Sequence, residues 1–268
     1  MNVFKLETRN AFKSTLIWTI SLCAVIFFML AFFPSMQTEA MKTLAATKME
    51  GMSSALLAAM GLSVMIDFSV VTNYFGYVLQ YLALAIMVYA AQQAATLLVK
   101  EETEGTISFL FAKPLNRETI FLQKAAANVC LLFFMLLLCF FATVIGYVLY
   151  SSSTFGTAVK ECGIMFLGVF FVALVYTAIG WPVSAIVRSS KSATGAAMAI
   201  VFGSFVLGVA SVLIKGLPFF KYLSPMDWIK TDKLLTIGLT PEEWFVGLSV
   251  LIVCPSLALL IYRRRDYL

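Results

Sequence analysis

The sequence predicts an all-α integral membrane protein with six transmembrane helices and both termini in the cytoplasm. Composition, the lengths of the apolar runs and the placement of basic residues predict it together. Of the 268 residues, 61% are hydrophobic and 12% are charged, whereas soluble domains carry about 45–50% apolar and about 25% charged residues. A chain this apolar has too little polar surface to face water on every side. It is suited to a lipid bilayer, where the solvent is itself apolar. Residues 1–268 are read as a single transmembrane domain, because no repeat or low-complexity linker divides them.

The apolar runs that can cross the hydrocarbon, which takes about 20 residues, are the predicted spans. They are residues 16–33, 70–99, 125–150, 162–187, 193–214 and 244–262. The first is read as an uncleaved span, because it ends in Phe32-Phe33-Pro34 rather than in a small-residue cleavage site. Residues 1–14 mix apolar residues with charges, so we expect a short helix lying on the inner membrane surface.

The segments on the outer side are expected to be helical as well. In residues 35–67 apolar residues recur at spacings of three and four, which predicts an amphipathic helix at the outer interface. Between spans five and six, Thr240-Pro241-Glu242-Glu243 offers an N-cap threonine, a proline at the first helical position and a glutamate at the third. We therefore expect one or two short outer helices, interfacial or re-entrant, within residues 215–243.

Basic residues predict the orientation, because cytoplasmic loops carry an excess of lysine and arginine. With the N-terminus inside, most of the 19 basic residues lie in the inner segments. These are Lys5, Arg9, Lys13, Lys100, Lys113, Arg117, Lys124, Arg188, Lys191, Arg263, Arg264 and Arg265. The inner loops are also the shorter ones, so their positive charge is denser. Both termini are therefore expected inside.

The residue inventory argues against several function classes. Histidine is absent and the spans hold no acidic pair, so the nucleophile, acid–base or metal set of an intramembrane enzyme is hard to assemble. Spans two to six carry no charged residue well inside the hydrocarbon, where ion-coupled transporters commonly place one. The five cysteines form no C-x-x-C pair, which predicts buried thiols rather than a disulfide frame or zinc site. The energy for any transport must come from outside this chain.

The most informative segment is the inner loop of residues 100–124, KEETEGTISFLFAKPLNRETIFLQK. Its acidic start precedes Gly105-Thr106, and the strongly apolar residues 107–111 follow. Pro114 breaks the helix, and Asn116 can cap a new helix that continues into the third span. Aromatic residues among charges make a docking surface for a soluble partner. A loop that merely dips into the interface explains the same residues.

The loop also carries a motif, E-x-x-G-T-x-x-x-L-x-x-x-P-L-x-R-x-x-x-x-x-x-K, which resembles the cytoplasmic loop of permeases of the type 2 ABC exporter family. Its matching positions are Glu102, Gly105, Thr106, Leu110, Pro114, Leu115, Arg117 and Lys124. The C-terminal Arg263-Arg264-Arg265-Asp266 is similar to the way many such permeases end. Six spans and an N-terminal surface helix agree with that family.

The resemblance implies a membrane-spanning permease subunit of an ATP-driven exporter, whose loop 100–124 forms a coupling helix seated in a separate ATPase. The implied docking residues are Glu101, Glu102, Glu104, Gly105, Thr106, Phe109, Leu110, Phe111, Pro114 and Arg117. Two permeases and two ATPases would form the complex, with ATP and Mg on the ATPase. This chain has no G-x-x-x-x-G-K-[ST] phosphate loop, so we expect it to hold no cofactor and to be no enzyme.

Partners and location follow from the same resemblance. The bacterial cytoplasmic membrane is the expected location, and no nucleic-acid partner is expected. In this family spans such as the fifth form the dimer seam, so Gly195, Gly203 and Gly208 would face a second permease or the central cavity, although packing within one bundle explains them equally well. A non-transporting anchor or sensor subunit is the alternative function. The sequence does not predict the substrate.

Overall fold

The computed structural model describes residues 3–50, 53, 57, 67–105, 116–151, 153–214 and 222–265. Within these ranges the secondary structure is helical, with no strand. Six of the described helical stretches are long and apolar enough to cross a membrane: Val3–Met36, Val71–Thr96, Arg117–Tyr150, Phe155–Ile186, Ser190–Ser211 and Pro241–Arg264. The predicted all-α, six-span fold is confirmed.

The N-terminal segment differs from the prediction. Helix α1 runs without a break from Val3 to Ala31, so residues 1–14 form no separate surface helix within the described part. Nothing in α1 interrupts a helix, because it contains neither glycine nor proline. Threonine hydroxyls bond within the helix: Thr8 and Thr15 donate to the carbonyls of Phe4 and Ala11, at 2.9 and 3.0 Å. The charged first half is therefore an extension of the first span.

The remaining helices keep the predicted order, with shifted boundaries. They are α2 (Phe33–Met36), α3 (Glu39–Glu50), α5 (Val71–Thr96), α6 (Lys100–Thr103), α8 (Arg117–Tyr150), α9 (Phe155–Ile186), α10 (Ser190–Leu213), the 3-10 helix η2 (Pro225–Ile229), α11 (Thr231–Thr236) and α12 (Pro241–Arg264). Helices α8 and α9 begin well before the apolar runs, since each starts at its N-cap residue. Asn116 and Thr154 occupy these positions with extended backbone, and the Thr154 side chain accepts from the Thr157 amide.

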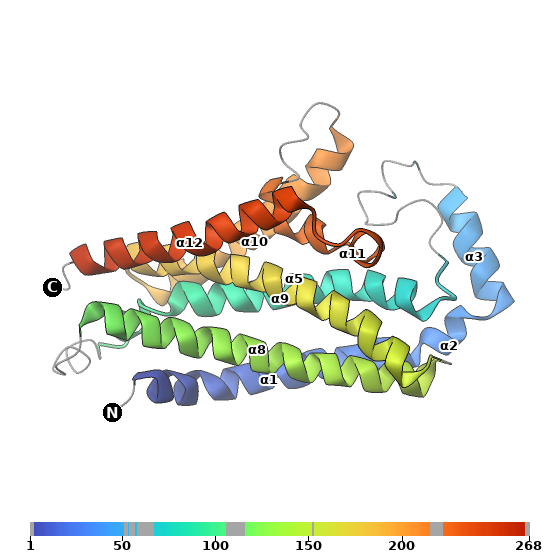
Figure 1. The fold of residues 1–268 in the computed structure, drawn as a ribbon, viewed down its shortest axis with the longest axis horizontal. Helices are drawn as coiled ribbons and strands as arrows, with labels where there is room; N and C mark the ends of the chain where they lie inside the picture. Colours follow the sequence, from blue (N-terminus) through green and yellow to red (C-terminus); the bar gives the residue numbers. More distant parts are fainter. Residues whose placement is uncertain are drawn as a thin grey trace.

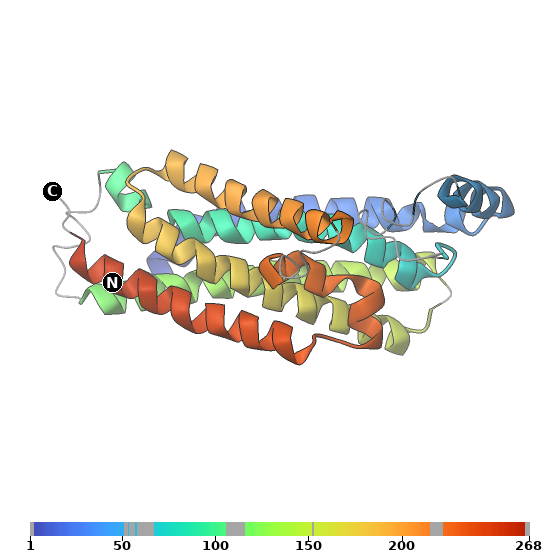
Figure 2. The same ribbon diagram turned by 90° about the horizontal axis from the view of Figure 1, so that it is seen from above.

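Helices α5 and α9 form the centre of the bundle (Figures 1 and 2). Helix α8 and the C-terminal α12 pack against α9, α1 packs chiefly on α8, and α10 packs on α5. Gly180 explains how closely the central pair approaches: a Cβ atom there would lie 2.6 Å from the Cβ of Ala94 and 2.9 Å from the Ala91 carbonyl oxygen. Small residues allow this contact, as is usual between membrane helices.

The segment between α10 and α12 holds the short helices that were predicted, and η2 is largely buried in the bundle. Trp228 of η2 is fully buried and its ring lies 6.5 Å from that of Phe171 on α9. Thr240 and Glu243 form the predicted capping box at the start of α12, and Glu243 also pairs with Lys233 of α11. The capping box and this ion pair satisfy the polar groups of Thr240, Lys233 and Glu243 where the segment meets α12.

Both ends of the described chain lie at the same end of the bundle (Figure 1). We call this the loop end, because α6 and the start of α8, which flank the predicted docking loop, lie there too. The opposite end carries α2, α3 and the turn between α8 and α9.

Candidate functional site

The structure describes the two ends of the predicted docking loop, which we call its stalks. The first stalk contains Glu101, Glu102, Glu104 and Gly105, and the second stalk contains Arg117. The other predicted docking residues, Thr106, Phe109, Leu110, Phe111 and Pro114, lie outside the described residues. The site can therefore be built from the points where the loop leaves and re-enters the bundle.

The first stalk is fastened to the bundle by its backbone and hydroxyl groups. After α5 a buried turn, Leu97 to Val99, leads into α6. The Leu98 amide donates to the hydroxyl of Ser184 on α9 at 2.6 Å. Thr103 of α6 accepts from both the amide and the hydroxyl of Ser190, at 3.1 Å each, where α10 begins. This stalk is thus tied to two further spans.

Gly105 ends the described part of this stalk. Its φ is +69°, in the left-handed region that glycine adopts without strain and that ends many helices. Its amide donates back to the Glu102 carbonyl at 3.3 Å. The motif's glycine is therefore used to turn the chain out of α6.

Lys124 on α8 is the most buried cation among the described residues of this end, with 1% of its surface exposed. Its ammonium donates to the Leu97 carbonyl at 2.7 Å, pairs with Glu101 and lies 3.2 Å from a carboxylate oxygen of Glu7 on α1. A buried charge persists only when it is paired and hydrogen-bonded. Three partners from two segments hold it, so Lys124 joins α8 to α1 and to the first stalk.

Arg117 binds the C-terminal end of α12. One of its guanidinium nitrogens donates to the carbonyls of Tyr262, Arg263 and Arg265, at 3.2, 3.1 and 2.7 Å. Carbonyl groups at the end of a helix lack partners inside it and carry partial negative charge, which a cation stabilises. The motif's arginine therefore caps the C-terminus of α12, and Glu118 beside it pairs with Arg263.

Arg265 completes the arrangement, because it connects the C-terminus to the first stalk. Its guanidinium pairs with Glu102 and donates to the Ala185 carbonyl on α9 at 2.8 Å. We call the six charged residues that link these elements the loop-end network. They are Glu7, Glu101, Glu102, Arg117, Lys124 and Arg265.

The loop-end network connects α1, α6, α8, α9 and α12 at the point where the docking loop emerges. Its lysine and its acids are largely buried, so removing one member would leave a partner charge without compensation. Both stalks of the loop are therefore joined to helices on both sides of the bundle.

The sequence predicted only part of this network. Glu102, Arg117 and Lys124 were motif positions and the C-terminal arginines were a family feature, but nothing assigned Arg265 to Glu102, which is 163 residues away. Glu7 was missed altogether. The signal was an acidic residue within a mostly apolar helix face, which in a membrane helix indicates a charged partner.

The three predicted glycines of α10 lie in different surroundings. A Cβ atom at Gly195 or Gly203 would meet nothing within 4 Å. Gly208 instead packs against the side chains of Ser224 and Asp227 at η2, so this chain covers it. A dimer or cavity face at α10 stays a prediction, and the open positions are Gly195, Ala199 and Gly203.

No group of three or more cysteine, aspartate or glutamate side chains in the described ranges could hold a metal ion. The cysteines are free thiols. That the chain carries no cofactor stays a prediction.

Comparison with known proteins gives a family match over nearly the whole chain. A family model described as "ABC-2 family transporter protein" matches residues 1–267. No curated protein matches the chain.

Proposed function

The chain belongs to the ABC-2 transporter family and is a membrane permease subunit of an ABC transporter, and we propose that a separate ATPase drives it as an exporter by docking on residues 100–124. The resemblance seen in the loop motif agrees with this family. The loop-end network carries the proposal, because it ties both stalks of that loop to the spans.

The network supports a specific route for the movement. ATP-driven closure of the ATPase would push on the loop 100–124. Glu102 would carry the push through Arg265 to α12 and α9, and Glu101 through Lys124 to α8. Because these residues are packed and paired, the spans would move together rather than the loop alone.

The proposed complex holds two permease copies and two ATPases. The exposed spacing Gly195-x-x-x-Ala199-x-x-x-Gly203 on α10 is the kind that lets two membrane helices approach closely, and it supports α10 as the contact between permeases. ATP and Mg would bind the ATPase. The loop end would face the cytoplasm of a cell whose cytoplasmic membrane contains the complex.

Affinity purification of the tagged chain from its host in mild detergent, followed by mass spectrometry, tests the docking. We expect a roughly equimolar ATPase, lost when Phe109 and Phe111 are both changed to Ala. Phe155→Ala combined with Phe245→Ala serves as a matched control, because both side chains are exposed near the starts of α9 and α12, at the other end. A clean preparation without ATPase would instead favour an anchor or sensor subunit.

Coupling is tested separately from docking. Arg265→Ala removes the pairing with Glu102 without touching the loop's apolar residues. We expect the ATPase still to co-purify with the variant. Its rate of ATP hydrolysis should no longer change when the permease is prevented from moving. If Arg265→Ala leaves that sensitivity unchanged, the proposed route through α12 is wrong.

A further inference from the structure

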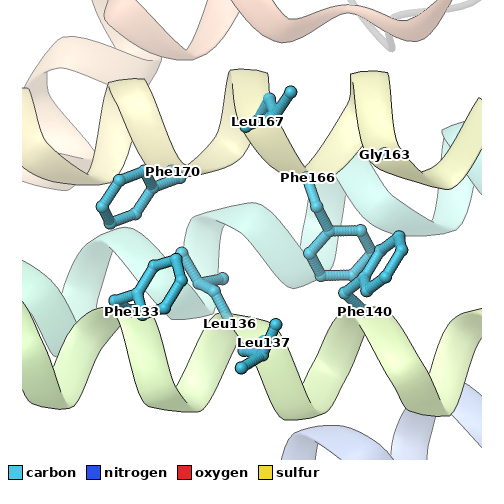
Figure 3. A pocket seen from close by; sticks show the side chains of 8 residues that line it. All are labelled: Phe133, Leu136, Leu137, Phe140, Gly163, Phe166, Leu167 and Phe170. Carbon is cyan, nitrogen blue, oxygen red and sulfur yellow. The ribbon is translucent and has the colours of Figure 1, made fainter.

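An apolar groove lies between α8 and α9 on the outside of the bundle, in the half away from the loop end. It encloses about 220 Å³ and is lined by Phe133, Leu136, Leu137, Phe140, Gly163, Phe166, Leu167 and Phe170. Figure 3 labels these residues, four from each helix, and draws the side chains of all but Gly163. None of them carries a polar side-chain group.

Aromatic pairs shape the groove. Phe133 and Phe170 pair at 5.6 Å between ring centroids, and Phe140 and Phe166 at 6.0 Å (Figure 3). Leu136 lies between the pairs and is buried. The wall is open at Gly163, where an added Cβ atom would meet nothing within 4 Å. The empty space there is therefore part of the groove and not a defect of packing.

The rim of the groove does not suit a second helix. Leu167 is 70% exposed and Phe133 51%, and such large side chains keep another helix at a distance, whereas membrane helices meet through small residues. A flexible hydrocarbon chain can enter between large side chains. Because α8 and α9 are membrane spans, lipid is the solvent on this face.

Lys160 does not line the groove, but its spacing from Gly163 and Leu167 puts it on the same face of α9, nearer the end of the span. It is exposed on α9, one helical turn before Gly163 and two turns before Leu167. It makes no ion pair with any described residue, and the neighbouring Glu161 is engaged with the hydroxyl of Thr72 on α5. A lysine near the end of a span extends its ammonium toward the headgroups.

The distance from this charge to Phe170, where the groove adjoins a second apolar pocket toward the loop end, matches one leaflet. Lys160 and Phe170 are ten residues apart on α9, which is about 15 Å along a helix axis. The hydrocarbon core of a bilayer is about 30 Å thick. The groove thus reaches from the headgroup region to about the middle of the membrane.

We propose that this groove binds an anionic phospholipid of the leaflet opposite the termini, with one acyl chain between α8 and α9 and the phosphate at Lys160. The apolar walls hold the chain and the ammonium selects the charged headgroup. The site does not depend on the transport direction or on the ATPase, because it lies away from the loop end.

Native mass spectrometry of the full chain in mild detergent tests the site, with phosphatidylglycerol and phosphatidylcholine of identical acyl chains as probes. We expect one phosphatidylglycerol per chain, bound about fivefold more tightly than phosphatidylcholine, as one lysine near a membrane surface contributes. Gly163→Leu fills the groove and should weaken phosphatidylglycerol about tenfold, as expected when about two methylene groups lose apolar contact.

Two controls keep the outcomes distinct. Gly156→Leu makes the same change on α9 at another position with nothing within 4 Å, outside the groove, and should bind as the unchanged chain does. Lys160→Gln should abolish the preference for phosphatidylglycerol while phosphatidylcholine binding stays, and Lys191→Gln on α10 should keep the preference.

Equal binding of the two lipids by the unchanged chain would overturn the proposal, and so would phosphatidylglycerol binding that Gly163→Leu leaves intact. If Gly163→Leu changes the mass of the oligomer and not its lipid content, the groove receives a second copy of the chain and the proposal is wrong. Should Gly163→Leu fail to fold, the preference lost or kept in Lys160→Gln decides the proposal.

Discussion

Replacing Lys124 by methionine should destabilise the bundle more than most single substitutions. The change keeps a long apolar side chain but removes the ammonium that pairs with Glu101 and lies 3.2 Å from Glu7. The side chains of these two acids are only 18% and 11% exposed, so water cannot replace the lost cation. Breaking a buried ion pair on one side costs about 3–5 kcal/mol.

The expected loss of Lys124→Met is therefore about 3–5 kcal/mol in the free energy of unfolding, measured by denaturant titration of the purified chain in mixed detergent micelles. Lys191→Met is the matched control, because Lys191 is an exposed lysine at the same end. It should change stability by less than about 0.5 kcal/mol.

The triple variant Lys124→Met with Glu7→Gln and Glu101→Gln separates charge from packing. Glutamine keeps the shape of each acid without its charge, so the triple variant leaves no buried charge unpaired and should recover most of the lost stability. If Lys124→Met unfolds like the control, or if the triple variant is weaker than Lys124→Met, the buried-charge reasoning is refuted.

Three further substitutions test particular contacts. Gly180→Ala places a Cβ atom 2.6 Å from that of Ala94 and should cost about 1–3 kcal/mol of stability by overpacking. Gly156→Ala, whose Cβ atom would meet nothing within 4 Å, should not destabilise the chain. Thermal unfolding in detergent compares the two variants, and equal midpoints would contradict the close α5–α9 packing. Gly105→Ala at φ +69° should cost about 1–2 kcal/mol in the same assay, and an unchanged midpoint would show that the left-handed turn is not needed. Thr240→Ala removes half of the capping box and should cost about 1 kcal/mol in denaturant titration, with Thr240→Ser retaining the stability; equal losses in both would rule out the cap as the cause.

The spans and the cap of the last one were predictable, because they depend on neighbouring residues, whereas Asn116 stands at the N-cap of α8 without a side-chain bond. Apolar runs of about 20 residues cross a bilayer wherever they occur, and the structure has six such helices among its described residues. Thr240 and Glu243 formed the cap that their spacing indicates. The predicted boundaries were wrong where a helix extends beyond its apolar run. Helix α1, for example, begins at Val3 although its apolar run begins at residue 16. Hydropathy indicates which residues lie in the membrane and not where a helix ends.

The partners in the loop-end network were not predictable in the same way. The motif named Glu102, Arg117 and Lys124, but the pairing of Glu102 with Arg265 requires the ends of α6 and α12 to meet. Nothing local distinguishes the buried Lys124 from the exposed Lys191. Likewise Gly208 shares its helix with Gly195, yet only Gly208 is covered by η2.

The sequence by itself determined that this protein lies in a membrane, how many spans it has and which loop carries the family motif. Transfer into hydrocarbon and helix capping are set by residues close together along the chain, so their pattern can be read directly. Only the tertiary structure decided which charges are buried together, which small residues remain open and where a groove faces the lipid. These depend on how α5, α8, α9 and α12 pack, and packing is the sum of many weak contacts between distant segments.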